Sequence, residues 1–111
     1  MRGVQSTGTL ATLKHFAANN KEAWRAVASS QVSERALREL YLKGFEIAVK
    51  EADPVFVMTG YNLLNGTHVS AHTGLLNGVL RGEWGFAGAV MSDWRVPERQ
   101  WREILAGNNI K

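Results

Sequence analysis

The sequence of 111 residues contains no cysteine and only two prolines. Without cysteine, the chain has no disulfide framework, no thiol nucleophile and no thiolate metal site. No run of about eighteen apolar residues occurs, so we expect no membrane-spanning helix. The formal net charge is only +3, and the Lys and Arg residues are interspersed with ten acidic residues. A nucleic-acid-binding surface needs a basic stripe, and the sequence has none.

Residues 1–8 lack the apolar region of a secretory signal peptide, which leaves both a cytoplasmic and a secreted or periplasmic location open. The hydrophobic content of 45%, with four tryptophans, is enough for the core of one modest domain. We find no low-complexity segment, linker or internal repeat. The chain is therefore expected to form one continuous folded unit.

Strand-like and helix-like segments alternate along the chain. Apolar residues at helical spacing predict helices, and short apolar runs bounded by turn residues predict strands. Residues 17–31 between the first strand and the first helix are polar and irregular. Alternation of this kind predicts parallel strands joined by right-handed helical crossovers. The predicted strands are 9–16, 55–59 and 89–92, and the predicted helices are 34–51, 72–81 and 97–105.

Residues with special backbone preferences mark the ends of these elements. Ser33 is suited to be the N-cap of the first helix. Asp53 is expected to end this helix, because the residue before a proline avoids the helical region. Asn65-Gly66 predicts a turn within the loop 60–70. Pro97 is suited to the first turn of the last helix, and Gly107 to its end. The continuous apolar run 55–59 predicts a strand covered on both faces.

Polar residues follow each of the three predicted strands. The pairs are Lys14-His15, Tyr61-Asn62 and Asp93-Trp94. Because parallel strands end at the same edge of a sheet, we expect these side chains to converge, as reactive groups do in α/β enzymes. Each pair alone has a simpler interpretation, since Asp93 could cap the next helix and His15 could be a hydrogen-bonded core residue. Three such pairs at one edge favour a functional site.

Several motifs in the same order resemble glycoside hydrolase family 3, the β-glucosidase and β-xylosidase family. The similarity covers nearly the whole chain, and it lies in the order and spacing of the motifs rather than in any one of them. The matching stretches are Lys14-His15-Phe16-Ala17-Ala18-Asn19-Asn20-Lys21-Glu22, Val32–Leu42, Met58-Thr59-Gly60-Tyr61-Asn62-Leu63-Leu64-Asn65-Gly66, Leu75–Phe86 and Met91-Ser92-Asp93-Trp94.

This resemblance implies a retaining hydrolase of terminal β-linked sugars, β-glucosides above all. It makes Asp93 the catalytic nucleophile, and it gives Lys14 and His15 the role of hydrogen-bonding the hydroxyls of the sugar that is cleaved off. Tyr61 is expected beside the nucleophile, and Trp94 in the same pocket. A retaining glycosidase also needs a protonated carboxylic acid about 5–5.5 Å from the nucleophile. Glucose, xylose and other sugars remain open as the substrate.

The chain departs from the family pattern at three places. Lys21 stands where the family commonly has Gln, Asn109 stands where Asp is frequent, and the charged stretch Arg95–Arg99 stands where small residues are usual. These differences leave the sugar pocket, and therefore the substrate, undetermined.

Length is the largest departure, because a (β/α)₈ barrel needs about 250 residues. We therefore expect residues 1–111 to be an incomplete barrel of three βα units, an internal part of the catalytic domain. By the resemblance, the upstream strands and a second domain with the general acid/base lie outside these residues. The isolated chain is expected to be inactive. The glutamates of this chain that could act as the general acid are Glu22, Glu83, Glu98 and Glu103. Glu83 follows the end of a predicted helix and Glu98 opens one, so both have a simpler structural explanation.

Two other interpretations stay open beside the enzyme. His68 and His72 have a spacing that can hold a metal on one helix, but no third ligand is evident, so we expect neither a metal nor a cofactor. The chain could also be a non-enzymatic or inactive βα module from a truncated gene. In an enzyme, Lys14, His15, Tyr61 and Asp93 must point into one concavity, with a carbohydrate and the rest of the enzyme as the only partners. In a non-enzymatic module, these four side chains are expected to be scattered.

Overall fold

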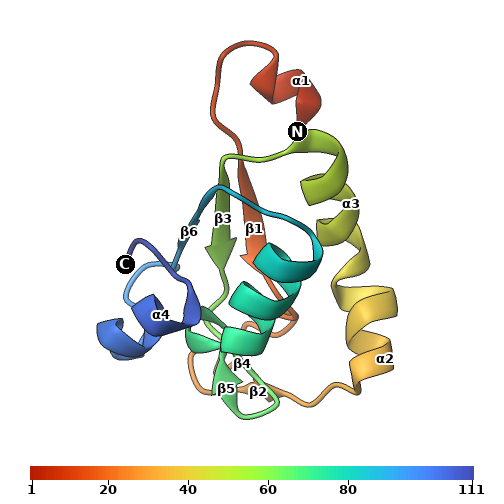
Figure 1. The fold of residues 1–111 in the computed structure, drawn as a ribbon. Helices are drawn as coiled ribbons and strands as arrows, with labels where there is room; N and C mark the ends of the chain where they lie inside the picture. The colour runs from red at the N-terminus through yellow and green to blue at the C-terminus, as the bar shows by residue number, and fades with distance from the viewer.

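The computed structural model describes all residues, 1–111, and its main sheet contains three parallel strands. These are β1 (Thr12–Phe16), β3 (Phe56–Thr59) and β6 (Ala89–Met91), in the order β1-β3-β6 (Figure 1). The middle strand pairs with both neighbours, so that Phe56 lies opposite Thr12 on one side and opposite Ala89 on the other. The predicted α/β class, with parallel strands and helical crossovers, is confirmed.

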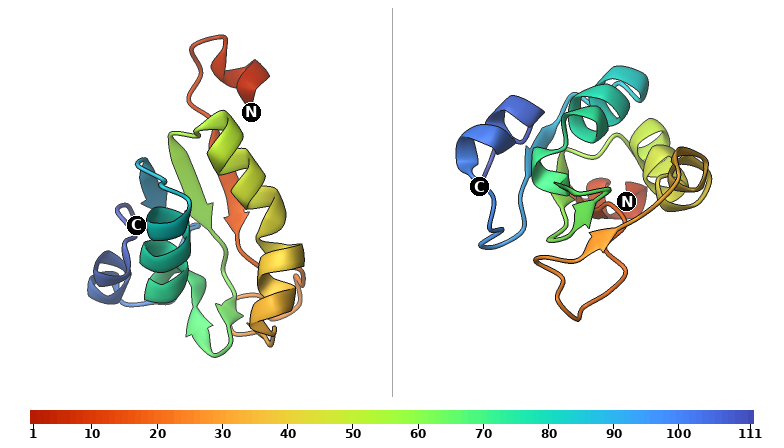
Figure 2. Two further views of the ribbon diagram at one scale, coloured as in Figure 1. Left: turned by 45° about the vertical axis from the view of Figure 1, so that its right-hand side comes forward. Right: turned by 90° about the horizontal axis from the view of Figure 1, so that it is seen from below.

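A helix follows each of these strands along the chain. The first runs without a break through α2 (Glu34–Ala36), a π-helical turn η1 (Leu37–Tyr41) and α3 (Lys43–Ala52); the others are η3 (Gly74–Glu83) and α4 (Gln100–Ala106). Two short pieces, α1 (Arg2–Gln5) and η2 (Val69–Ala71), complete the set. Figure 2 shows α3, η3 and α4 arranged in an arc around the sheet. No helix is long and apolar enough to cross a membrane.

The predicted ends of the first helix are confirmed. The Ser33 hydroxyl accepts a hydrogen bond from the Ala36 amide at 3.3 Å, which satisfies one of the free N–H groups of the first turn. At the other end, Asp53 adopts a left-handed conformation with φ of 44°, and the chain then turns into β3. The predicted helix 34–51 is thus observed at 34–52.

The core lies between the sheet and this arc of helices. Phe16 at the end of β1 is completely buried and meets Phe45 of α3 edge to face, with ring centroids 5.1 Å apart. It meets Trp84, just after η3, in the same way at 6.0 Å. Aromatic pairs of this geometry add about 0.5–1.5 kcal/mol each to the effect of burial. One side chain therefore ties β1 to two helices.

A second small sheet lies beside the carboxyl ends of the main strands. It contains β2 (Ser29–Ser30), β4 (Leu63–Leu64) and β5 (Thr67–His68), in the order β2-β4-β5. Asn65 and Gly66 have φ of 48° and 88° and form the hairpin turn between β4 and β5. The Asn65 side chain also accepts from the Val32 amide at 2.8 Å and donates to the Val32 carbonyl at 2.9 Å. The turn was predicted, whereas these two-residue strands were not.

Three predicted details of the elements are wrong. The last helix begins at Gln100 with Arg99 as N-cap, so Pro97 belongs to the preceding turn segment rather than to the first helical turn. Helix η3 begins and ends two residues later than predicted, with Thr73 as its N-cap, and the His72 Nδ1 atom accepts a hydrogen bond from the Leu75 amide at 3.1 Å. The run 55–59 is predicted to be covered on both faces, but β3 alternates between half-buried and buried residues, since helices cover only one face of this sheet.

The Arg81 guanidinium joins the end of η3 to β6 and α4. One of its terminal nitrogens donates to the carbonyls of Phe86 and Gly88, at 3.3 and 3.1 Å. The other donates to the Gly107 carbonyl at 3.2 Å and to Asn109 Oδ1 at 2.8 Å. The same Asn109 oxygen accepts from the Val90 amide of β6 at 2.9 Å, so the amide at this position supplies the acceptor that Arg81 needs.

We expect Arg81→Met to loosen β6 and α4 selectively, because four hydrogen bonds from one cation are lost. In the full-length protein, amide hydrogen exchange over residues 88–110 should accelerate by about 30-fold or more, equivalent to about 2 kcal/mol, while residues 37–52 change little. Arg102→Met is the matched control, since the exposed Arg102 side chain forms an ion pair with Glu98 alone, at 3.4 Å. Equal acceleration of amide exchange over residues 88–110 and 37–52 would show that Arg81 does not stabilise β6 and α4 selectively.

Candidate active site

Residues from β1 and from the end of β6 meet at the carboxyl edge of the main sheet. His15 Nε2 lies 3.4 Å from Asp93 Oδ2, and the Asp93 side chain is only 12% exposed. The other oxygen, Asp93 Oδ1, accepts a hydrogen bond from the Trp94 amide at 2.7 Å. Each carboxylate oxygen therefore has its own neighbour, which holds the group in a defined orientation.

Tyr61, which follows β3, lies in the electrostatic field of this carboxylate. Burial of the phenol and the negative charge of Asp93 raise the pKa of Tyr61 above its usual value of 10.0. The guanidinium carbon of Arg25 lies 4.3 Å from the centroid of the Tyr61 ring, and its positive charge opposes that rise. The phenol consequently stays protonated at neutral pH and can donate a hydrogen bond beside Asp93.

Lys14 takes a different position from its neighbour His15. It is exposed, it forms no ion pair with Asp93, and it borders a shallow depression between β1 and the helix that contains Tyr41 and Phe45. The structure thus brings His15, Tyr61 and Asp93 together and leaves the Lys14 ammonium outside contact distance of the carboxylate. The functional roles of all four remain predictions.

A cavity of about 290 Å³ adjoins Asp93, close to the lower end of the range for small-molecule sites. Trp94 lies at its rim with 79% of its surface exposed, so a flat apolar face is presented to solvent beside the carboxylate. Arg95 also lines this cavity, whereas Lys14, His15 and Tyr61 do not, so the four predicted site residues do not share this concavity. Its lining residues are Met58, Met91, Ser92, Asp93, Trp94, Arg95, Ile110 and Lys111.

Asn62 holds the two neighbouring strand ends in place. Its amide nitrogen donates to the carbonyls of Ala17 and Ala18, at 3.2 and 3.3 Å, and the side chain is almost completely buried. These bonds tie the segment after β3 to the segment after β1. Asn62 therefore fixes the framework around Tyr61 and His15 rather than facing the cavity.

Arg25 was not singled out from the sequence. It lies in the irregular segment after β1, and the only local feature that could have pointed to it is Glu22, three residues earlier in the sequence. In the structure, Arg25 Nη1 pairs with Glu22 Oε2 at 3.0 Å while the same guanidinium stacks on Tyr61. A contact between the loops after β1 and β3 is a tertiary feature that local sequence does not encode.

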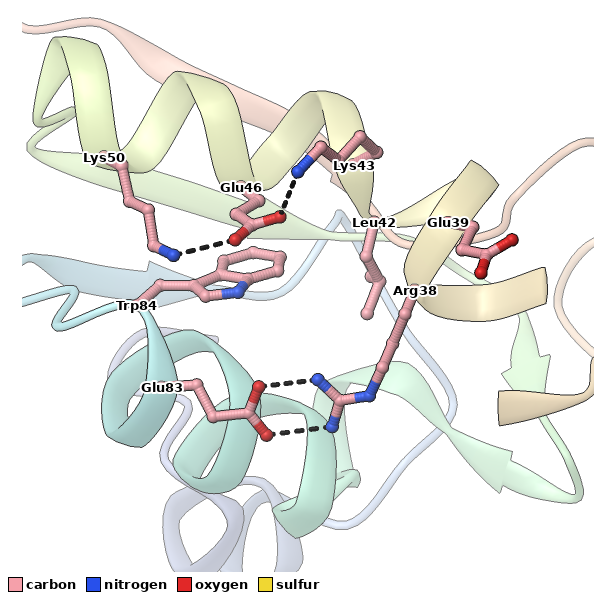
Figure 3. A pocket seen from close by; sticks show the side chains of 8 residues that line it. All are labelled: Arg38, Glu39, Leu42, Lys43, Glu46, Lys50, Glu83 and Trp84. Atoms are coloured by element: carbon pink, nitrogen blue, oxygen red, sulfur yellow. Dashed lines mark hydrogen bonds and ion pairs between the residues drawn. The ribbon is translucent and has the colours of Figure 1, made fainter. Parts of the chain in front are cut away.

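The largest cavity, about 500 Å³, lies elsewhere, between α2–α3 and η3 (Figure 3). Arg38 donates two hydrogen bonds to Glu83, at 2.6 and 2.8 Å, and the pair spans the groove. Lys50 and Lys43 both hold Glu46, at 2.7 and 3.0 Å. These cations lower the pKa of Glu83 and of Glu46. The charges compensate one another here, and no residue from the strand ends contributes.

The other acidic residues that could assist Asp93 already have partners. Glu22 pairs with Arg25 at 3.0 Å. Glu98 accepts from the Arg99 amide at 2.7 Å and pairs with Arg102 at 3.4 Å. Glu103 is buried and lies 3.0 Å from Lys111. Asp93 is the one carboxylate that lines the 290 Å³ cavity.

Residues 1–100 match the model of the glycosyl hydrolase family 3 N-terminal domain. Over all 111 residues the chain is 57% identical to a beta-glucosidase of Rhizobium radiobacter and 47% identical to an exo-alpha-(1->6)-L-arabinopyranosidase of Bifidobacterium longum. It spans 14% and 15% of these relatives, respectively.

Among solved structures, beta-glucosidase 3B from Thermotoga neapolitana in complex with glucose superposes with a TM-score of 0.96 at 55% identity. The match covers 98% of this chain and 15% of that one.

The raised pKa of Tyr61 gives a direct test of the site's electrostatics. In the full-length protein, absorbance at 295 nm compared with that of Tyr61→Phe should report ionisation of this phenol above its ordinary pKa of about 10. Asp93→Asn should lower the midpoint, because a negative neighbour is removed, and Arg25→Ala should raise it further. An unchanged midpoint in both variants would show that neither charge acts on Tyr61.

Proposed function

The chain belongs to glycosyl hydrolase family 3, and from this premise we propose that it forms three consecutive βα units in the catalytic barrel of a longer retaining β-glycosidase. The carrying observation is that Asp93 and His15 meet at 3.4 Å at the shared carboxyl edge of parallel strands. This edge is where barrel enzymes place their reactive groups. The small share of each relative that the chain spans supports a longer parent protein.

In the proposed mechanism, Asp93 is the nucleophile. Its carboxylate attacks the anomeric carbon of a β-glycoside, the bond to the leaving oxygen breaks, and a covalent glycosyl ester forms with inverted configuration. Water then attacks the same carbon and releases Asp93, so that the product has the original β configuration. The nearly buried carboxylate, held by the Trp94 amide and next to His15, is already oriented for attack.

The residues at the carboxyl ends of β1 and β3 have the donors that a sugar requires. We assign hydrogen bonding of sugar hydroxyls to His15 and to Lys14, whose exposed ammonium has no carboxylate partner in the chain. The protonated Tyr61 phenol is assigned a hydrogen bond beside the nucleophile, where it can stabilise the carboxylate as it departs in the second step. Trp94 is assigned the apolar face against which a ring packs.

The general acid/base is proposed to come from outside residues 1–111. A retaining enzyme needs its two carboxyl groups about 5–5.5 Å apart. Glu22, Glu98 and Glu103 are each engaged by a cation, and Glu83 is held by Arg38 in the other groove. A second segment of the full-length enzyme must therefore supply the proton to the leaving group.

We propose glucose as the sugar because of the names that two of the relatives carry. The Rhizobium radiobacter and Thermotoga neapolitana proteins are both named beta-glucosidases, and the latter was solved with glucose. A relative that is 47% identical is named an arabinopyranosidase, so the sugar is a separate question from the reaction. The relevant test substrates are therefore β-glucosides, with α-L-arabinopyranosides as the comparison.

Replacing the nucleophile should abolish turnover without unfolding the protein. In the full-length enzyme, Asp93→Asn should lower kcat for 4-nitrophenyl β-glucoside by ~10⁴-fold or more, because an amide of the same shape is a poor nucleophile. The chain's only other aspartate supplies the matched control, Asp53→Asn. Asparagine tolerates the left-handed conformation at this helix end, so this control should stay close to wild type. Near-normal turnover of Asp93→Asn would refute the assignment.

A further inference from the structure

Arg95 has an unusual backbone conformation and lines the cavity beside Asp93. It comes two residues after Asp93, its φ is +58°, and its side chain is exposed. A residue other than glycine is seldom held in this left-handed region, and such conformations are concentrated at functional sites. The residue also lines the 290 Å³ cavity of Asp93. A cationic residue therefore lines the candidate site two positions after Asp93.

The other cation that lines this cavity, and the one that stacks on Tyr61, already have anionic partners. Arg25 pairs with Glu22 at 3.0 Å, and Lys111 pairs with Glu103 at 3.0 Å. Arg95 forms no hydrogen bond or ion pair with any residue of the chain, although Glu98 lies only three positions away and is bound by Arg102 instead. Within residues 1–111, the positive charge of Arg95 is thus unpaired.

The geometry of the guanidinium and one neighbouring residue indicate what this charge recognises. An arginine fork matches a carboxylate in a bidentate way that neutral groups do not reproduce. The adjacent Trp94 presents a flat, exposed apolar face. His15 contacts Asp93 without lining this cavity, whereas Trp94 and Arg95 line it together with Asp93, so we assign the cavity to the part of a substrate beyond the bond that is cleaved.

We propose that Arg95 is a specificity-determining residue, which selects β-glycosides whose leaving group is an aromatic ring that carries a carboxylate. The ring packs against Trp94 while the carboxylate is bound by the Arg95 guanidinium at the cavity mouth. This inference rests on the proposed glycosidase function, and it adds the chemical class of the leaving group.

The test compares two substrates of nearly the same shape, 4-carboxyphenyl and 4-carbamoylphenyl β-D-glucoside, with the full-length enzyme. Arg95→Ala should lower kcat/KM for the carboxylated substrate by about ten-fold and that for the neutral amide by less than two-fold. Arg95→Lys should keep an intermediate preference. The control is Arg99→Ala, which removes an exposed arginine of the same segment that does not line the cavity. Salt should narrow the preference for the carboxylated substrate wherever a cation remains at position 95, and should have no such effect in Arg95→Ala.

A binding measurement separates this proposal from the proposed reaction. In the Asp93→Asn background, calorimetric titration with the two glucosides should show the same preference for the carboxylate, and the preference should disappear when Arg95→Ala is added. If the wild type hydrolyses neither glucoside but this binding difference is found, the reaction is wrong and the recognition stands. An equal effect of Arg95→Ala on both substrates, or no binding difference, would overturn the role of Arg95.

Discussion

The candidate site depends on one constraint, the parallel pairing of β1 and β6 with the middle strand β3. Because all three strands run in the same direction, the residues at their carboxyl ends share one edge of the sheet. His15 and Asp93 are far apart in the sequence, yet their side chains approach to 3.4 Å. Helices α3 and η3 impose this direction, since each returns the chain to the opposite edge before the next strand begins (Figure 1).

Side chains outside the cavity then keep that edge in place. Asn62 ties the end of β3 to the segment after β1, and Arg81 ties β6 to η3 and α4. Gly88 belongs to the same framework, because a side chain there would collide with the Val55 carbonyl, whose oxygen accepts from the Ala89 amide at 3.0 Å. Buried polar groups with several partners give this region a single arrangement, and Asp93 inherits its orientation from it.

Patterns that repeat along the chain could be predicted from the sequence, and single tertiary contacts could not. The helix 34–52 has a cap, an apolar face and a stop, and the strand ends show their polar pairs directly. Strands β2, β4 and β5 are too short to carry any periodicity, and Pro97 suits a turn as well as a first helical turn. The stacking of Arg25 on Tyr61 and the position of Lys14 away from Asp93 depend on neighbours from other elements, which no local pattern specifies.

The central claim is that Asp93 forms a covalent bond to the sugar. The most direct measurement is to incubate the full-length protein with 2-deoxy-2-fluoro-β-D-glucosyl fluoride, whose fluorine slows both steps and whose good leaving group favours accumulation of the intermediate. Peptide mapping by mass spectrometry should then locate one fluoroglucosyl group on the peptide that contains Asp93, and none on the same peptide of Asp93→Asn. A label on any other carboxylate, or hydrolysis without a trapped ester, would contradict the account.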